Sequence, residues 1–475
     1  MALVLAIPAL SAVILTALPG YRLTARLNVL ASFATFVAAA LLFAVDRPPP
    51  GEFLLIDNLN IVFIALNTFV GLTAAVFSAS YIGHEIETGR LTPVHVRFYH
   101  AMYQLMMFGM NLALVSNNIG LMWVAIELAT LTTVLMVGIY RTHEALEAAW
   151  KYFILGSVGI ALALFGTILV YVTAQPILGE GTRSMVWTEL MSRAGDFDAS
   201  LLNLAFVFLL LGYGTKVGLA PLHAWLPDAH AEGPTPISAV LSGLLLNVAL
   251  YAVLRFKMLI AANPDALAPG PLMVGMGLLS LIFAGFMLYR RRDIKRLFAY
   301  SSIEHMGIIV FAFGMGGPLA NFAGLLHMVM HSLTKSAIFF TVGHVAQING
   351  SQKIGDIRGL TQSHPVLGWG LALGVLAIAG LPPFGVFMSE FLIVTSTFPR
   401  APLLALLLVF GMLVAFGALL LRLTGFLFGD PSGSAQPARA SITPVYLHIA
   451  LVLVAGLYLP APLVVWFRSV AELLG

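Results

Sequence analysis

Residues 201–226 have the sequence LLNLAFVFLLLGYGTKVGLAPLHAWL, an apolar run interrupted by one lysine, Lys216, and one proline, Pro221. A helix needs about 20 mostly apolar residues to cross the roughly 30 Å of hydrocarbon in a bilayer. Proline inside a helix removes a backbone donor and clashes with the preceding turn. This stretch therefore predicts a broken transmembrane helix that carries a buried charge.

The whole chain has the composition of a membrane protein. Of its 475 residues, 60% are hydrophobic and 9% are charged, and the mean hydropathy is +0.96. Soluble domains have about 25% charged residues, so the composition excludes soluble, disordered and nucleic-acid-binding proteins. The chain has no cysteine, which excludes disulfides, thiolate zinc sites and cysteine-ligated iron–sulfur clusters within it.

Similar apolar runs recur along the chain and predict an all-α polytopic membrane protein with about 14 transmembrane helices. The predicted segments are 2–19, 27–45, 59–81, 98–117, 119–139, 150–174, 201–226, 235–257, 272–289, 297–314, 319–346, 366–396, 402–428 and 442–467. Lys and Arg are more frequent in the loops of one side, which include Arg97, Lys295 and Arg439. Because cytoplasmic loops collect these residues, we expect both termini outside, with Arg255 and Lys257 in outward loops.

Six charged residues fall within the predicted spans. They are Glu127, Lys216, Glu304, Lys335, Glu390 and Arg422. Each charge near the bilayer centre costs on the order of 2.5–3.5 kcal/mol, and such residues usually mark ion or proton pathways. Structural ion pairs between helices are the alternative, but the spread over six helices favours a polar line across the bundle.

The segment 319–346 has the sharpest local pattern. His327, His331 and Lys335 are spaced at i, i+4 and i+8, so they share one helical face. A single buried histidine is usually a structural core residue. Three stacked titratable groups favour a proton relay, because imidazole exchanges protons near neutral pH. Two histidines on one face cannot bind opposite sides of a haem.

A second predicted helix, 366–396, is broken as well. Its sequence GLPPFG, residues 380–385, contains Pro382 and Pro383 and precedes Glu390. Breaks at membrane depth persist where the freed backbone is buried in protein or lines a wet cavity. A passive kink is the alternative, but each break lies within two turns of a charge, which favours a functional role.

These breaks also indicate an internal repeat. Residues 218–223, GLAPLH, are similar to residues 380–385, and Ile126-Glu127 is similar to Ile303-Glu304. Each match shifts by five predicted helices, which places the two copies in opposite orientations. The expected organisation is two inverted five-helix repeats. Its parts are 1–97 (N-terminal helices), 98–257 (first repeat), 272–428 (second repeat) and 442–475 (C-terminal helix).

Three stretches resemble the antiporter-like, proton-translocating membrane subunits shared by respiratory complex I, Mrp antiporters and membrane-bound hydrogenases. They are 126–135 (IELATLTTVL), 216–230 (KVGLAPLHAWLPDAH) and 299–307 (AYSSIEHMG). The resemblance covers residues 55–430. Within the family, residues 127–171 and 241–251 are most similar to component F of hydrogenase-4-type complexes.

The resemblance implies roles for individual residues. Glu127 and Lys216 match the family's Glu–Lys pair, whose changing contact gates proton movement. His331 and Lys335 match the central relay, and Glu390 matches the exit residue.

Asn247 departs from the family pattern, since many relatives have lysine there. Asparagine cannot take up a proton, so water or another group must bridge this gap, and Glu304 and His305 are candidates. The complete predicted pathway is Glu127, Lys216, His223, Glu304, His305, His327, His331, Lys335 and Glu390, with Lys151, Asn247 and Arg422 as further candidates and Pro221, Pro382 and Pro383 at the helix breaks.

The resemblance also implies a function: a proton-translocating subunit in a prokaryotic cytoplasmic membrane, without a cofactor or metal of its own. Its expected partners are other membrane subunits and peripheral redox subunits that hold NiFe and iron–sulfur centres. The alternative is a secondary cation/proton antiporter or an ion-coupled uptake module without a redox partner. An intramembrane enzyme is disfavoured, because the sequence has no His-Glu-x-x-His, P-loop or Gly-x-Ser-x-Gly motif.

Overall fold

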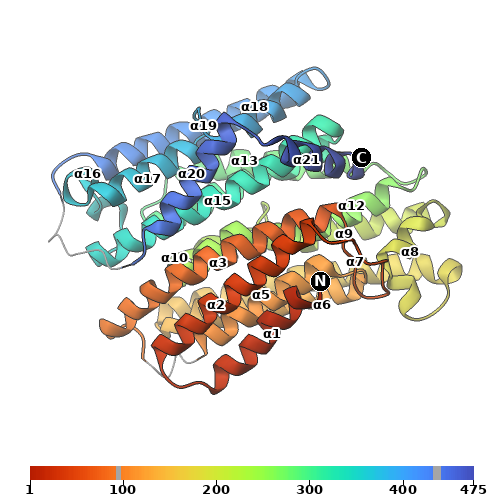
Figure 1. Cartoon of the computed structure of the whole chain (residues 1–475). Helices are drawn as coiled ribbons and strands as arrows, with labels where there is room; N and C mark the ends of the chain where they lie inside the picture. Colours follow the sequence, from red (N-terminus) through yellow and green to blue (C-terminus); the bar gives the residue numbers. More distant parts are fainter. Residues whose placement is uncertain (93–97, 432–439) are drawn as a thin grey trace.

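Long apolar helices make up the structure, a computed structural model that describes residues 1–92, 98–431 and 440–475 (Figure 1). The first half contains α1 (Ala2–Ala17), α2 (Tyr21–Ala40), α3 (Asn58–Glu87), α5 (Tyr99–Val115), α6 (Ile119–Val137), α7 (His143–Leu178), α8 (Trp187–Ser192), α9 (Ala199–Val217), α10 (Trp225–Glu232), α11 (Thr235–Val240) and α12 (Leu246–Ala261). The second half contains α13 (Gly270–Leu288), α14 (Ile294–Met315), α15 (Pro318–Asn349), α16 (Leu360–Ser363), α17 (Pro365–Ile378), α18 (Gly385–Thr397), α19 (Pro402–Leu427), α20 (Thr443–Leu457) and α21 (Ala461–Leu473). A π-helical turn, Leu241–Leu245, joins α11 to α12. Short 3-10 helices span Leu41–Phe43, Gly138–Tyr140, Thr182–Met185, Ala194–Asp196 and Ile354–Asp356.

The predicted all-α membrane fold is confirmed, but the count of 14 spans is not. Ten helices among the described residues are long and apolar enough to cross a membrane, and the bent pair α20–α21 would make eleven. The helices α1, α17 and α18 are apolar but shorter than the 18 residues that define a candidate span. The predicted run 366–396 falls on two of these short helices, because the chain turns between them.

Both predicted helix breaks are present. The helix α9 ends at Val217, Gly218 follows with φ +83°, and α10 begins only at Trp225. The helix α17 ends at Ile378 and α18 begins at Gly385. In the first break the backbone N–H of Ala220 donates to Oγ of Ser280 (2.9 Å), so protein rather than lipid satisfies this freed donor.

The most buried spans lie in the centre of the bundle. The apolar windows of Thr235–Ala261, α15 and α14 are 100%, 94% and 89% buried, against 28% for Tyr21–Phe43 and 33% for α19. The helix α15 packs against α3, α14, α17, α18 and α20 and lies in the interior in Figure 1. Two of the helices predicted to carry a charge of the polar line, α14 and α15, are therefore shielded from lipid, whereas α19, which carries Arg422, is not.

Glycines let neighbouring helices approach closely. A Cβ atom added to Gly277 of α13 would lie 2.6 Å from the carbonyl oxygen of Gly307 on α14, and the reverse substitution gives the same distance. Gly212 of α9 is similarly close to the backbone of Ala163 on α7. Small residues at such crossings are typical of membrane helices, which associate by close packing because lipid removes the hydrophobic driving force between them.

Three cations that were expected in loops are buried at helix ends, so this expectation is wrong. On α12, Arg255 Nη2 lies 2.6 Å from Oδ2 of Asp57, and Lys257 Nζ donates to the carbonyl of Leu474 (2.9 Å). On α14, Lys295 Nζ donates to two carbonyls at the end of α10, each at 2.8 Å. Fixed acceptors replace water for these charges.

The two chain termini lie at the same end of the bundle (Figure 1). Asn111, near the end of α5, donates to the carbonyl of Val4 (3.2 Å), and Asn58, at the start of α3, donates to Ser469 (3.3 Å). Termini on one side agree with the predicted topology, while the side itself stays a prediction. Arg97 and Arg439, which contributed to it, lie outside the described residues.

Candidate functional site

Glu127 and Lys216 form an ion pair inside the first half of the bundle. Nζ of Lys216, in the last turn of α9, lies 3.3 Å from Oε2 of Glu127 on α6 and 3.0 Å from Oγ1 of Thr130. The lysine side chain is 1% exposed and the glutamate side chain 18%. A Cβ at Gly156 of α7 would lie 3.0 Å from Nζ, so the absence of a side chain there leaves room for the ammonium group.

Aromatic residues fix the backbone next to this ion pair. The indole N–H of Trp225, at the start of α10, donates to the carbonyl of Thr215 (2.8 Å). Tyr152 of α7 stacks on Trp225 with ring centroids 4.3 Å apart, and its hydroxyl bonds to Thr133 of α6 (2.8 Å). These contacts connect the break after α9 to α7 and to α6, the helix that carries Glu127.

Hydroxyl groups occupy the gap at Asn247. Its Nδ2 donates to Oγ of Ser332 on α15 (2.7 Å) and to the carbonyl of Gly243 (2.9 Å). Gly243 lies in the π-helical turn together with Ser242. The hydroxyl of Ser242 is 2.7 Å from the hydroxyl of Ser302 on α14. Such π turns often mark functional sites. The sequence interpretation missed these serines, because serine is common in membrane helices and has no charge to attract attention.

Lys335 is completely buried on α15. Its Nζ donates to the carbonyl of Phe298 on α14 (2.9 Å) and lies 5.6 Å from the centre of that aromatic ring. One turn earlier, both ring nitrogens of His331 lack a hydrogen-bond partner among residues 1–92, 98–431 and 440–475. The ring of His331 lies 5.6 Å from that of His305, so α14 and α15 present these groups to each other.

A histidine cluster joins α14, α15 and α18. Nδ1 of His305 and Nε2 of His327 are 3.0 Å apart, and Nδ1 of His327 is 2.9 Å from Oγ of Ser389. Nε2 of His305 lies 3.4 Å from Oε2 of Glu304. Glu390 is buried beside these groups, and its Oε2 would lie only 2.0 Å from a Cβ at Gly380. The break between α17 and α18 therefore makes room for the Glu390 carboxylate.

His223 and two of the further candidates, Lys151 and Arg422, make other contacts. His223, in the break after α9, packs against Phe283 with ring centroids 4.8 Å apart. Lys151 is about half exposed and pairs with Glu147 (2.6 Å) and Asp228 (3.2 Å). Arg422 donates to the carbonyl of Tyr289 (2.6 Å) and lines a cavity of about 1400 Å³ rich in arginine. The structure does not bring Lys151 and Arg422 to the buried line.

His230 is a buried polar residue that the sequence interpretation left unassigned. On α10 its ring stacks on Phe339 of α15 (centroids 4.7 Å apart), and within the described part of the chain neither ring nitrogen has a hydrogen-bond partner. A lone histidine in a short helix has no periodic pattern that would have identified it.

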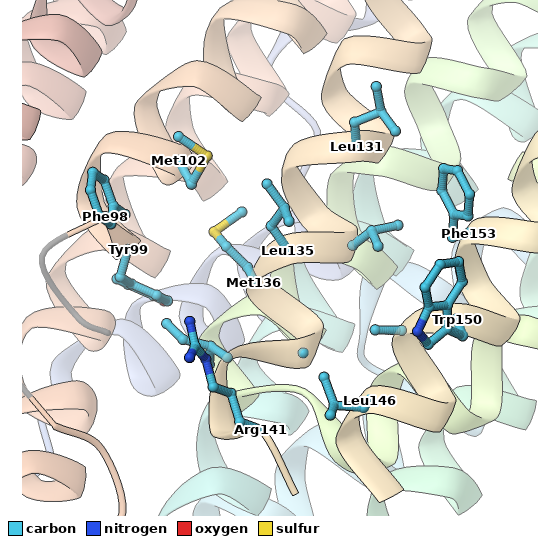
Figure 2. Close-up of a pocket in the computed structure, with 14 residues that line it drawn as sticks. Phe98, Tyr99, Met102, Leu131, Leu135, Met136, Arg141, Leu146, Trp150 and Phe153 are labelled. Atoms are coloured by element: carbon cyan, nitrogen blue, oxygen red, sulfur yellow. The ribbon is translucent and has the colours of Figure 1, made fainter. Parts of the chain in front are cut away.

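An apolar cleft lies between α5, α6 and α7, with a volume of about 1090 Å³ (Figure 2). Leu131, Leu135, Trp150 and Phe153 line it, with Arg141 at one end. None of the predicted pathway residues lines it, so it is separate from the buried polar groups.

Two comparisons relate the sequence of this chain to known proteins. Residues 116–416 match the family described as NADH:quinone oxidoreductase/Mrp antiporter, TM. The chain is 64% identical over 474 residues to a hydrogenase-4 component F homolog of Methylacidiphilum infernorum (isolate V4), covering 100% of this chain and 99% of that protein.

Two solved structures share the fold. One is a chain of the membrane-bound sulfane sulfur reductase, an archaeal respiratory membrane complex, with a TM-score of 0.89, 24% identity and coverage of 100% and 97% of the two chains. The other is a chain of the Mrp complex from Dietzia sp. DQ12-45-1b, with a TM-score of 0.84, 18% identity and coverage of 99% and 96%.

Proposed function

The chain belongs to the NADH:quinone oxidoreductase/Mrp antiporter transmembrane family, and we propose that it is the proton-translocating membrane subunit of a redox-driven complex of the hydrogenase-4 or complex I type. One observation carries the proposal. Ionisable and hydroxyl side chains lie buried in the centre of the bundle from Lys216 on α9 to Glu390 on α18. Groups of this kind inside a membrane are costly and usually serve ion or proton movement.

The first step is the exchange of a proton at Lys216. While Glu127 lies 3.3 Å away, its negative charge favours the ammonium form. Movement of the broken helix or of α6 that separates the two groups removes this attraction, and burial then favours the neutral amine. Lys216 releases its proton toward α15 in that state.

The second step crosses the Asn247 gap. Asparagine has no titratable proton, but a serine hydroxyl both donates and accepts. Ser332 and the Ser242–Ser302 pair can therefore relay a proton by exchanging hydrogen bonds, together with any water in this region. Lys335, three residues after Ser332 on α15, receives the proton.

The last step passes through the histidine cluster. The hydrogen bond between His305 and His327 (3.0 Å) joins two imidazoles, each of which can accept a proton on one nitrogen and release one from the other. Glu390 then delivers the proton to the exit. In this scheme the segments 98–257 and 272–428 act as two inverted half-channels joined at α15.

Electron transfer in this proposal belongs to other subunits. The chain has no cysteine, and the NiFe and iron–sulfur centres that would drive it are assigned to peripheral partners. The proposal includes a prokaryotic cytoplasmic membrane as the location of the complex, with both termini of this chain outside. The alternative is a cation/proton antiporter or an ion-coupled uptake module without a redox partner, and the fold shared with the Mrp chain supports it.

Purification separates the two functions. The complex is extracted in mild detergent or nanodiscs, and its subunits are identified by mass spectrometry and its metals measured. Recovery with nickel, iron and hydrogenase-like subunits supports the redox-driven complex. Recovery alone, or with small membrane subunits and no metal, favours the antiporter or uptake module.

A further inference from the structure

Two imidazoles and a carboxylate converge where α14, α15 and α18 meet. One possible ligand atom from each of His305, His327 and Glu390 lies within 4.8 Å of the other two, and all three residues are buried. The imidazole rings of His305 and His327 are stacked with centroids 5.2 Å apart, and Nδ1 of the first faces Nε2 of the second. The structure thus gathers two nitrogen ligands and one oxygen ligand from three helices.

The other nitrogen of each ring faces a second polar group. Nε2 of His305 is 3.4 Å from Oε2 of Glu304, and Nδ1 of His327 is 2.9 Å from Oγ of Ser389. Histidines that bind metals commonly hold their second N–H on a carboxylate or another acceptor, which fixes the ring orientation. Nδ1 of His305 and Nε2 of His327 therefore face each other, in a cluster whose possible ligand atoms, including one of Glu390, lie within 4.8 Å of one another.

We propose that His305, His327 and Glu390 form an intramembrane binding site for a divalent transition-metal ion, Zn²⁺ in particular. Zinc takes imidazole and carboxylate ligands at about 2.0–2.2 Å, and sites with three protein ligands keep a fourth position open. Two nitrogens of a tetrahedral site lie about 3.3 Å apart at those bond lengths. The observed N–N distance of 3.0 Å needs to open by a few tenths of an ångström, and the carboxylate of Glu390, within 4.8 Å of the two imidazoles, needs to move closer.

The two carboxylates at the site favour binding of a divalent cation. Glu390 as a ligand and Glu304 behind His305 supply two carboxylates for two positive charges, which reduces the cost of a buried ion. With both imidazoles neutral, the proton of His305 lies on Nε2, toward Oε2 of Glu304, and that of His327 lies on Nδ1, toward Oγ of Ser389. The metal then takes the lone pairs of Nδ1 of His305 and Nε2 of His327 without net loss of an imidazole proton, and a proton on Glu390 leaves to solvent. The sequence contains no metal-binding motif, because these ligands come from positions 305, 327 and 390 on separate helices.

Metal binding has a functional consequence that rests on the proposed function. The same lone pairs carry protons in the proposed pathway, so a bound Zn²⁺ ion blocks the last step. Binding itself does not depend on that function.

The test uses the intact complex after treatment with a chelator. ZnCl₂ is added in increments, unbound metal is removed by desalting, and retained zinc per complex is measured by mass spectrometry. We expect one more zinc per chain in the wild type than in H305Q, H327Q or E390Q, and X-ray absorption at the zinc edge should show two imidazole ligands. H344Q is the matched control, since His344 is also buried on α15 but is not part of the cluster; it should retain as much zinc as the wild type.

Equal zinc retention by the wild type and the three ligand variants would overturn the site. E390Q preserves side-chain shape, so it still decides the question if a histidine variant does not fold. Proton translocation is measured on the same samples. Zinc that binds at the cluster without inhibiting translocation upholds the site and contradicts the proposed pathway, whereas active translocation with no cluster-dependent zinc contradicts the site alone.

Discussion

Replacement of Glu127 by glutamine tests the gate of the proposed pathway. Glutamine has the shape of glutamate and keeps an oxygen acceptor, so Lys216 should keep its contact with Thr130 at 3.0 Å. Only the negative charge is lost. At the observed 3.3 Å, the attraction is about 5 kcal/mol for an effective dielectric of 20. Removal of one partner of a buried pair costs about 3–5 kcal/mol, and the lower value applies here because the glutamate side chain is 18% exposed.

A loss of about 3 kcal/mol changes the balance between the paired and separated states by about a hundredfold. We therefore expect E127Q to translocate as few protons per electron pair as K216M, the reference for complete loss. The assay is acidification of proteoliposomes that contain the whole complex, followed with a pH-sensitive dye and driven by the natural electron donor.

The matched control is Glu147, whose carboxylate lies 2.6 Å from Lys151. Both side chains of that pair are about half exposed, so water compensates for the lost charge and E147Q should translocate like the wild type. Wild-type proton translocation by E127Q would refute the gating argument.

Two further substitutions test the structure around the pathway. G380A should reduce translocation, because the added Cβ would lie 2.0 Å from Oε2 of Glu390 at a backbone φ of +70°. The control G350A has a similar φ of +62° but open space around the added Cβ. Its backbone strain, about 1 kcal/mol, should lower the melting temperature without loss of translocation. Equal translocation by G380A and G350A would contradict the argument. R255M should destabilise the protein by about 3 kcal/mol, because it removes the partner that lies 2.6 Å from Asp57, and an unchanged melting temperature in detergent would contradict this expectation.

Features whose energetic cost is local could be predicted from the sequence. Apolar runs identify the helices, and Pro221, Pro382 and Pro383 identify the breaks, because proline in a helix interior removes a backbone donor and clashes with the preceding turn. A charge inside an apolar run is costly in any membrane fold, which identified Glu127 and Lys216 before their contact was known.

Contacts between distant helices could not be predicted in the same way. The hydrogen bond from Asn247 to Ser332 and the approach of His305 to His327 depend on how α12, α14 and α15 cross. No spacing within one helix encodes such a crossing.

Charges near helix ends were assigned with the least success. Lys257 and Lys295 follow or precede apolar runs as loop residues do, yet backbone carbonyls bind them inside the protein. Arg422 lies in a different setting. It lies within an apolar run, but α19 has 26 residues and is about 39 Å long. That length exceeds the hydrocarbon thickness, so its last turns reach the polar cavity beside Tyr289.

Proton translocation by a K335M complex tests the central claim most directly. Lys335 is completely buried and donates to the carbonyl of Phe298, and methionine retains its length without the charge. The account predicts an assembled complex that still transfers electrons in detergent but translocates fewer protons per electron pair in proteoliposomes. An unchanged number of protons per electron pair would contradict a pathway through α15.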